Sequence, residues 1–301
     1  MSKSFYSCGK LLLTGEYAVL FGSQAFAIPT KLGQHLTVND GKTKGELNWE
    51  AKDEKDTIWF HATFSIKTLE IIKTDNVEVA ERLKNMLLFS KSISTFLDVE
   101  SCAVTTKTEF PINFGLGTSS TLMNNLALWA NIDPFKILNH SFSGSGFDLA
   151  VAQCNAPVLY HLSHSSPNWN KRNPNWDFTK KLFFIHLNEK AISREKIKTN
   201  INFTDEKLKE ISFLTNELLD CKSLSQFNKL IMKHEEIVSS AIGKDTIKNK
   251  LFPNFDGAMK SLGAWGGDFI LATGEQEYIE EFFSSKGYNS IFNYSELILN
   301  G

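Results

Sequence analysis

The segment FPINFGLGTSST at residues 110–121 constrains the fold more than any other part of this sequence. Gly115 and Gly117 bracket a turn, four hydroxyl side chains follow in a row, and an apolar run predicts a helix over residues 119–129. Glycines that let the backbone approach a ligand, at the start of a helix whose amides point outward, form a common phosphate-binding site. The segment matches neither the Walker loop nor the GxGxxG pattern, so it predicts a phosphate loop of another kind.

Two more glycine-rich segments lie far from the first, CGKLLLTGEYAVLFG at residues 8–22 and GAWGGDF at residues 263–269. A single glycine loop is most often an ordinary turn, so each one alone is weak evidence for a function. A fourth segment, GSGFDLA at residues 144–150, places Asp148 at the start of an apolar helix. An acid at this position also fits a helix cap, so the residues alone leave its role open.

Strand and helix signals alternate along the chain and predict an α+β protein. Strands are expected at residues 5–13, 17–28, 57–64, 103–108, 182–187, 269–273 and at the C-terminus, and helices at residues 78–96, 119–129, 204–220, 224–241 and 275–286. Residues 161–180 are rich in Pro, Asn and Ser, which predicts a loop or an interdomain connection. We therefore expect two domains, residues 1–165 and 180–301, the second with the element order of a split βαβ sheet.

Charge and composition exclude several classes of protein. The 32 basic and 34 acidic residues give a net charge of −2, without the basic surface that binds nucleic acid. No segment approaches the ~20 apolar residues that span a bilayer, and Lys10 and Glu16 interrupt the apolar N-terminus, so we expect neither a membrane span nor a signal peptide. The 4 cysteines lie far apart, which argues against a zinc site and favours reduced thiols in a cytoplasmic protein.

In their order along the chain, these four segments resemble the motifs of the GHMP kinases, the superfamily of galactokinase, homoserine kinase, mevalonate kinase and phosphomevalonate kinase. Residues 8–22 resemble the N-terminal Gly-Lys and Gly-Glu motif, residues 111–120 the phosphate loop, and residues 263–269 the C-terminal glycine motif. The resemblance implies the α+β, two-domain GHMP kinase fold, with a ribosomal protein S5 domain 2-like N-terminal domain and a ferredoxin-like C-terminal domain.

The resemblance also implies a role for each matching residue. Asp148 matches the aspartate that accepts the proton of the substrate hydroxyl or stabilises its alkoxide, and Lys10 matches the lysine that pairs with it. A positive charge within ~4–6 Å favours both a carboxylate and a developing alkoxide, so the pair is chemically sensible. Ser119 matches the loop serine that contacts Mg²⁺. The implied ATP-binding residues are Gly115, Leu116, Gly117, Thr118, Ser119, Ser120, Gly266 and Gly267.

The chain departs from the family pattern at several positions. Thr118 stands where serine is usual, and Ser120 where alanine is usual. Trp265 stands where glycine is expected in the third motif, so we expect its indole to border the nucleotide or substrate pocket. Mevalonate kinases also carry a glutamate shortly before the aspartate as a second magnesium ligand, whereas residues 134–140 read PFKILNH and contain no acid.

The segments GKLLLTGEYAVL and GSGFDLA look closest to the phosphomevalonate kinase branch, and the missing glutamate agrees with that, whereas the short length favours the more compact mevalonate kinases. We therefore expect a cytoplasmic enzyme of isoprenoid precursor synthesis that uses ATP and Mg²⁺ to phosphorylate mevalonate or phosphomevalonate. Nucleic acid and membranes are not expected partners, and a homodimer is an open option. Two alternatives also stay open: an enzyme like mevalonate diphosphate decarboxylase, and a non-catalytic relative that binds a small molecule. Retention of both Lys10 and Asp148 counts against the second.

Other polar residues have less specific interpretations. His234 lies on an apolar helix face, which favours a hydrogen-bonded core histidine over a substrate contact. Glu16 either orients Lys10 or faces solvent, and the sequence does not favour one over the other. Candidates for binding a substrate phosphate are Lys31, Lys107 and Arg194.

Overall fold

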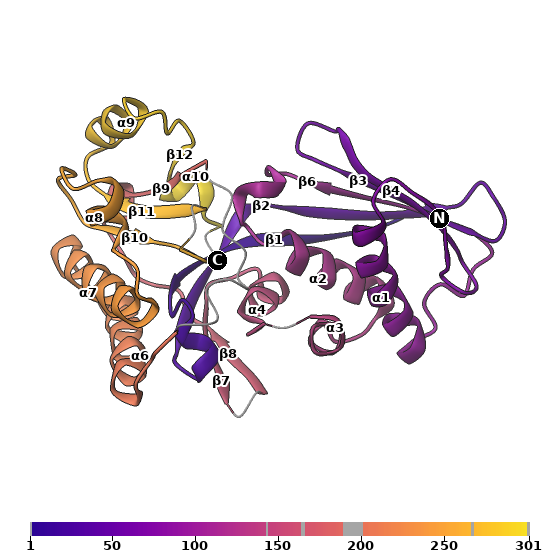
Figure 1. Cartoon of the computed structure of the whole chain (residues 1–301), viewed down its shortest axis with the longest axis horizontal. Coiled ribbons are helices and arrows are strands. Elements are labelled where there is room, and N and C mark those ends of the chain that lie inside the picture. Colours follow the sequence, from indigo (N-terminus) through magenta and orange to yellow (C-terminus); the bar gives the residue numbers. More distant parts are fainter. Residues whose placement is uncertain (1, 143, 164–165, 189–200, 266–267, 300–301) are drawn as a thin grey trace. The chain divides into compact units, whose positions relative to one another are not determined.

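The structure is a computed structural model that describes residues 2–142, 144–163, 166–188, 201–265 and 268–299 (Figure 1). Its strands are β1 (Lys3–Thr14), β2 (Ala25–Asp40), β3 (Glu46–Lys52), β4 (Ile58–Ser65), β5 (Ile71–Thr74), β6 (Cys102–Thr108), β7 (Val158–Ser163), β8 (Ser166–Lys171), β9 (Leu182–His186), β10 (Met259–Ser261), β11 (Phe269–Thr273) and β12 (Ile291–Asn293). Its α-helices are α1 (Val77–Ile93), α2 (Thr118–Ala130), α3 (Pro134–Ser141), α4 (Phe147–Cys154), α6 (Asp205–Asp220), α7 (Leu224–Ile242), α8 (Ile247–Leu251), α9 (Gln276–Ser284) and α10 (Tyr294–Leu297). Within these residues, no helix combines the length and the apolar character needed to cross a membrane.

The chain packs into two compact units, and strands β1 and β2 each continue from one unit into the other. Unit 1 comprises Met1–Gly9, Leu32–Ile112 and Leu116–Gln153, and unit 2 comprises Lys10–Lys31, Asn113–Gly115 and Cys154–Gly301. The glycine loop therefore divides between them, with Gly115 in unit 2 and Gly117 in unit 1. These units describe packing, and the domain boundaries expected at residues 1–165 and 180–301 stay a prediction.

In unit 1, the strands follow the order β5-β4-β3-β6-β2. Strands β3 and β6 pair in parallel and the other neighbours are antiparallel. Strand β6 alternates between buried and half-buried residues along its length, as expected for a strand with one face on the core. Helix α2 binds the sheet through a buried amide: Asn125 accepts from the Ser7 hydroxyl on β1 at 2.7 Å and donates to the Gln34 carbonyl on β2 at 2.8 Å. These bonds fix the helix that follows the glycine loop.

Unit 2 contains a second sheet, whose described strands follow the order β10-β11-β9-β12 and are antiparallel throughout. The chain order is β9, α6, α7, α8, β10, β11, α9 and β12, which is a ferredoxin-like arrangement of strands and helices. All residues of β9 and β11 are buried, and the core beside them is rich in aromatic rings, including those of Phe183, Phe252, Phe255 and Phe283. The expected architecture of the C-terminal part is confirmed.

The strand expected over residues 17–28 is wrong in its first half. Ala18–Phe21 form a 3-10 helix, η1, and β2 begins only at Ala25. The backbone turns here because Gly15, Tyr17 and Gly22 have positive φ angles of 87°, 61° and 87°. A short apolar run gives the same sequence signal in a buried turn as in a strand, so the run alone did not distinguish them.

The loop expected over residues 161–180 is also wrong in part. Strand β8 pairs with β7 in antiparallel register, with Trp169 opposite Tyr160. It lies at the end of the described strand order, and an edge strand tolerates the proline and asparagines that suggested a loop. At the C-terminus, the expected strand is limited to β12, because a capping box between Asn293 and Glu296 starts helix α10.

Candidate active site

Helix α2 begins directly after the glycine loop, as the sequence predicts. Its N-cap is Gly117, in the left-handed region with φ 97° and ψ 38°, and the amide of Thr121 donates to the Gly117 carbonyl at 3.0 Å. The amides of Thr118, Ser119 and Ser120 precede this bond, so they are the N-terminal donors for which an α-helix supplies no acceptor. Together with the positive end of the helix dipole, they form the kind of site that binds an anionic oxygen.

The hydroxyl groups of the loop differ in what they can reach. Ser120 and Thr121 are each 1% exposed; Ser120 Oγ donates to the Gly117 carbonyl at 2.8 Å, and Thr121 Oγ1 donates to Gln34 Oε1 at 2.7 Å. Ser119, by contrast, has an exposed side chain. Ser119 is therefore the better placed of these three hydroxyls for a metal ion, whereas Ser120 offers a ligand its amide.

Lys10 holds a buried positive charge against the glycine loop. It lies near the end of β1, is 6% exposed, and its ammonium donates to the Gly115 carbonyl at 2.8 Å. A buried ammonium is costly unless its protons are bound. The strand therefore fixes a cation at the backbone of the loop where phosphate is expected.

Asp268, which none of the sequence motifs marks as a site residue, lies against the same glycine. A Cβ atom at Gly115, whose φ is +70°, would lie 2.6 Å from Asp268 Oδ2, and one at Gly263 would lie 3.6 Å from this oxygen. A side chain at position 115 would thus collide with the carboxylate. The acid is visible in the sequence within GGDF, but an acid after glycines is also typical of an ordinary turn.

Asp148 lies in the first turn of α4, as expected, and its Oδ1 accepts the amide of Leu149 at 3.1 Å. Its side chain is half-buried. Gly146, just before the helix, has a φ of +82°, and a Cβ there would lie 2.7 Å from the Phe135 ring, so only glycine fits. The helix dipole favours a carboxylate in the first turn, which is compatible with a chemical role as well as with capping.

The third glycine-rich segment is described only in part. Gly266 and Gly267, predicted to bind nucleotide, lie outside the described residues. Trp265 has a left-handed φ of 53°, and its indole packs on the apolar cluster of η1, α6 and α7 that includes Ile211 and Val238. The left-handed backbone explains why glycine is the residue expected here. Its packing is that of a core residue, and its expected place beside a pocket stays a prediction.

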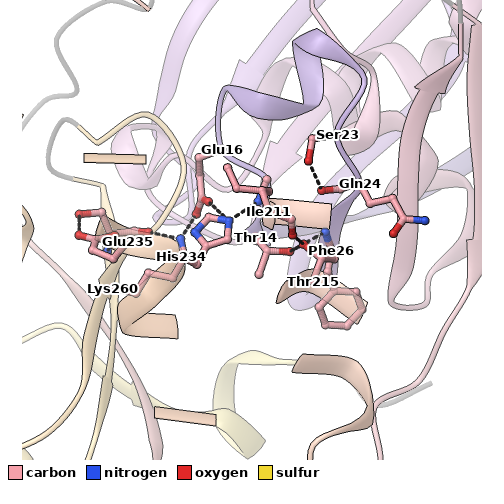
Figure 2. Close-up of polar contacts among 12 residues, drawn as sticks. Thr14, Glu16, Ser23, Gln24, Phe26, Ile211, Thr215, His234, Glu235 and Lys260 are labelled. Carbon is pink, nitrogen blue, oxygen red and sulfur yellow. Dashed lines mark hydrogen bonds and ion pairs between the residues drawn. The ribbon is translucent and has the colours of Figure 1, made fainter. Parts of the chain in front are cut away.

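Glu16 is buried and pairs with a different lysine from the one considered (Figure 2). Its carboxylate accepts from the ammonium of Lys260, so of the two alternatives that the sequence left open, the one in which Glu16 faces solvent is wrong. His234 is 1% exposed and its Nε2 accepts the Gly15 amide at 2.8 Å, which confirms a hydrogen-bonded core histidine. Burial raises the pKa of Glu16 to about 7 and lowers the pKa of His234 well below its usual value.

Two of the lysines considered for a substrate phosphate have protein partners. Lys31 donates to the Ser295 carbonyl at 2.6 Å, and Lys107 pairs with Asp56 at 2.7 Å. Arg194 lies outside the described residues. In the part of the chain that the structure describes, no group of three or more His, Cys, Asp or Glu side chains is arranged to hold a metal. A metal at the loop would therefore depend on hydroxyl and phosphate oxygens besides any carboxylate.

Comparison with known proteins bears on the fold. No family model matches the chain, and no curated protein matches its sequence. Among solved structures, the mevalonate kinase of Methanococcus jannaschii has a TM-score of 0.74 at 18% identity, with 100% of this chain and 99% of that chain covered. The phosphomevalonate kinase of Streptococcus pneumoniae, in complex with phosphomevalonate and AMPPNP, has a TM-score of 0.65 at 15% identity, with 97% and 98% covered. The galactokinase of Lactococcus lactis, complexed with galactose, has a TM-score of 0.67 at 12% identity, with 100% and 94% covered. All three are GHMP kinases, and this chain has the two-domain α+β fold of that superfamily.

Proposed function

We propose that this protein is a magnesium-dependent kinase that transfers the γ-phosphate of ATP to the hydroxyl group of mevalonate or phosphomevalonate. The observation that carries the proposal is the buried Lys10 ammonium bound to the carbonyl of Gly115 in the glycine loop. Phosphoryl transfer requires mainly positioning and neutralisation of charge. A fixed cation at a loop that ends in a helix N-terminus supplies both.

Asp148 is proposed to take the proton of the substrate hydroxyl. Helix α4 is fixed to β1 within unit 1, because Cys8 Sγ donates to the Val151 carbonyl at 3.9 Å, three residues after Asp148. Lys10 lies two residues further along the same strand as Cys8, and we propose it as the cation that acts with Asp148, as the resemblance implies. As the hydroxyl oxygen bonds to the γ-phosphorus, its proton passes to the carboxylate, and the bond from phosphorus to the bridging oxygen breaks to leave ADP. Lys10 stabilises the developing alkoxide.

The residues at the loop fit a magnesium ion. Ser119 offers an exposed hydroxyl, and the Asp268 carboxylate fills the space beside Gly115 that a side chain would otherwise take. Hydroxyl, carboxylate and phosphate oxygens are the ligands that Mg²⁺ takes in proteins. We propose Asp268, which lies against Gly115, as a protein ligand of this ion that supplies the acid residues 134–140 lack, and Ser119 stays the ligand that the resemblance implies. Bound Mg²⁺ neutralises charge on the transferring phosphate.

Support for the substrate class comes from two sources. The segments GKLLLTGEYAVL and GSGFDLA resemble the mevalonate and phosphomevalonate kinase branch. Of the three similar structures described above, two are kinases named for these substrates, and one is a galactokinase. We therefore place mevalonate and phosphomevalonate first, and galactose and homoserine after them.

One assay distinguishes these possibilities. The protein is incubated with ATP and Mg²⁺ and, separately, with mevalonate, phosphomevalonate, mevalonate diphosphate, homoserine or galactose, and the products are identified by phosphorus NMR. We expect a new phosphate resonance with mevalonate or phosphomevalonate, and none from the Asp148→Asn protein, which controls for kinases of the expression host. Release of carbon dioxide from mevalonate diphosphate would instead indicate a decarboxylase. Binding of ATP without turnover of any compound would contradict the kinase and favour a non-catalytic binding protein.

A further inference from the structure

A polar cluster is buried beneath the Gly-Glu-Tyr turn that follows β1 (Figure 2). Its ionisable members are Glu16, His234, Glu235 and Lys260, each 2% exposed or less. The ammonium of Lys260 donates to the Glu16 carboxylate and, at 2.8 Å, to the carbonyl of Ser261. Burial of charged groups opposes folding unless each finds partners. The partners of this cluster therefore show what it holds together.

Two adjacent residues of α7 connect the first and the third glycine-rich segments. His234 accepts the Gly15 amide of the first segment through Nε2, and burial together with the nearby Lys260 charge lowers its pKa, so it is neutral. Glu235 accepts the amide of Ser261 at 3.0 Å and its hydroxyl at 2.9 Å, at the end of β10, two residues before the third segment. Helix α7 thus binds the middle of the first segment and the strand that leads into the third.

The turn also contacts the third segment directly. The hydroxyl of Tyr17 donates to the carbonyl of Ala264 at 2.6 Å. Tyr17 has φ 61° and ψ −42°, and Trp265, the neighbour of Ala264, has a φ of 53°. Residues other than glycine persist in such conformations only where the surrounding structure holds them. The bond from Tyr17 therefore joins two strained stretches of backbone.

We propose that Tyr17 is a positioning residue that, with the Glu16–Lys260 pair, holds the described start of the third glycine-rich segment, residues 263–265, in place before a ligand arrives. Tyr17 acts through the Ala264 backbone rather than on the ligand itself. Backbone that is already held in place loses less conformational freedom on binding, so the affinity for the ligand is higher. The proposal rests on the proposed function only in taking ATP as that ligand.

The test compares two substitutions of tyrosine by phenylalanine. Tyr17→Phe removes the hydroxyl that binds Ala264 and keeps the ring. Tyr278→Phe is the matched control, because the Tyr278 hydroxyl also binds one backbone group, accepting the Asp256 amide at 2.8 Å, and packs with the separate aromatic core of unit 2. Hydrogen exchange measured by mass spectrometry reports on the amides of residues 260–265 in the ligand-free protein. Titration with a fluorescent ATP analogue reports the affinity.

We expect Tyr17→Phe to accelerate exchange of these amides about 3- to 10-fold, the effect of losing one neutral hydrogen bond. The dissociation constant of the analogue should rise by a similar factor, while Tyr278→Phe changes neither quantity. Unchanged exchange in Tyr17→Phe would overturn the proposal, and so would faster exchange with unchanged affinity. If the wild-type protein binds no ATP analogue, the kinase function fails, and the exchange rates still decide whether Tyr17 holds the segment.

Discussion

The phosphate loop and the third glycine-rich segment meet the same backbone requirement in different ways. In the loop, the left-handed positions are occupied by Gly115 and Gly117, with φ angles of 70° and 97°. In the third segment, Gly263 has a φ of 68°, but Trp265 occupies a second left-handed position at 53°. Glycine adopts this backbone without strain, whereas tryptophan needs contacts that compensate for it. The third segment takes those contacts from Tyr17, which lies far away in the sequence, and from the apolar cluster of η1, α6 and α7.

This difference determines what a substitution should change in each region. The loop adopts its left-handed backbone because the residues there are glycines. Substitutions of the chemical groups around it are therefore expected to affect kinetics more than folding. The third segment depends on a buried cluster of charges, so changes there are expected to lower the free energy of unfolding. Kinetic and thermodynamic measurements on matched variants therefore separate the two regions.

The largest effect is expected for Asp148→Asn, which keeps the shape of the side chain and removes its charge and basicity. Loss of a general base lowers turnover by about 10²- to 10⁴-fold, with far less effect on ATP binding. Lys10→Met should also lower turnover, and the two losses should not add, because each residue acts through the other. Steady-state kinetics of both single variants and of the double variant measure this.

The matched control for this prediction is Asp133→Asn, since Asp133 also begins a helix and accepts an amide, that of Phe135 at 3.0 Å. Its turnover should equal that of the wild type. Turnover of Asp148→Asn within about threefold of the wild type would reject the mechanism, given the size expected for a general base. Additive losses would reject only the coupling between Lys10 and Asp148.

In the buried cluster, Lys260→Met should lower the free energy of unfolding at pH 7 by about 3–5 kcal/mol, because Glu16 and Glu235 then lose their buried counter-charge. The control is Lys181→Met, whose partner Glu275 is 74% exposed and whose own side chain is 37% exposed. Exposed pairs contribute about 0.2–1 kcal/mol. Urea denaturation of both variants tests the difference, and equal losses would show that the cluster contributes no more than a surface pair.

The protonation of Glu16 should be visible when the free energy of unfolding of the wild type and of Glu16→Gln is compared as a function of pH. Burial raises the pKa of Glu16 from 4.5 to about 7, so between these values the folded state keeps a proton that the unfolded state has lost. The stability from this group is complete below pH 4.5 and is lost as the pH rises to about 7, a change of about 3 kcal/mol. The wild type should therefore lose stability relative to Glu16→Gln over this range.

The comparison with Glu16→Gln is needed because the neighbouring groups titrate as well. His234 has a lowered pKa, so its contribution is present above its unfolded value and is lost as the pH falls, which opposes the effect of Glu16. Glu235 has a raised pKa, and Lys260 faces all three groups. These residues are present in both proteins, so their contributions largely cancel in the difference. A difference in stability that stays constant from pH 4 to pH 8, or that has the opposite slope, would contradict the assignment.

Asp268→Asn should raise the Mg²⁺ concentration for half-maximal activity by about 10- to 100-fold, the usual effect of losing a group from a metal site. Without Mg²⁺ the variant should bind an ATP analogue more tightly than the wild type does, because it lacks a negative charge that repels the phosphates. Titrations of the analogue with and without Mg²⁺ measure both effects. The exposed Asp256 provides the control variant, Asp256→Asn, and weaker binding of Asp268→Asn under both conditions would argue against a metal ligand.

The parts of the protein that the sequence predicts are those with local causes. Gly117 and the apolar spacing after it indicate the start of α2, and the periodicity of residues 204–220 and 224–241 indicates the two helices of unit 2. The Glu16–Lys260 pair joins residues 244 positions apart, and no local pattern marks either partner. Asp268 was missed for the same reason, because its significance depends on a contact with Gly115 that only the folded chain makes. Strand β8 was missed because an edge position tolerates residues that usually mark a loop.

The smallest expected effect is a difference in stability between two variants of Trp265, and it tests the comparison of the loop with the third segment. Trp265→Ala and Trp265→Gly both remove the indole from the cluster of η1, α6 and α7, so both should be less stable than the wild type. Alanine keeps a Cβ in a left-handed backbone, which costs about 1–2 kcal/mol, whereas glycine does not. Trp265→Gly should therefore be more stable than Trp265→Ala by about 1 kcal/mol, the reverse of the usual order in a helix or strand.

Two further variants serve as controls for the sign of the stability difference between alanine and glycine. Gly117→Ala should also be destabilising, since Gly117 has a φ of 97°, whereas Ala127→Gly inside α2 should lose about 1 kcal/mol in the ordinary direction. Chemical denaturation gives all four values, and steady-state kinetics on the same proteins separate packing from ligand binding. Lost stability with unchanged kinetic constants would make Trp265 a packing residue, and changed kinetic constants with little lost stability would place it at the pocket. If Trp265→Ala is as stable as Trp265→Gly, the left-handed backbone at this position is not a source of strain, and the contrast between the two segments fails.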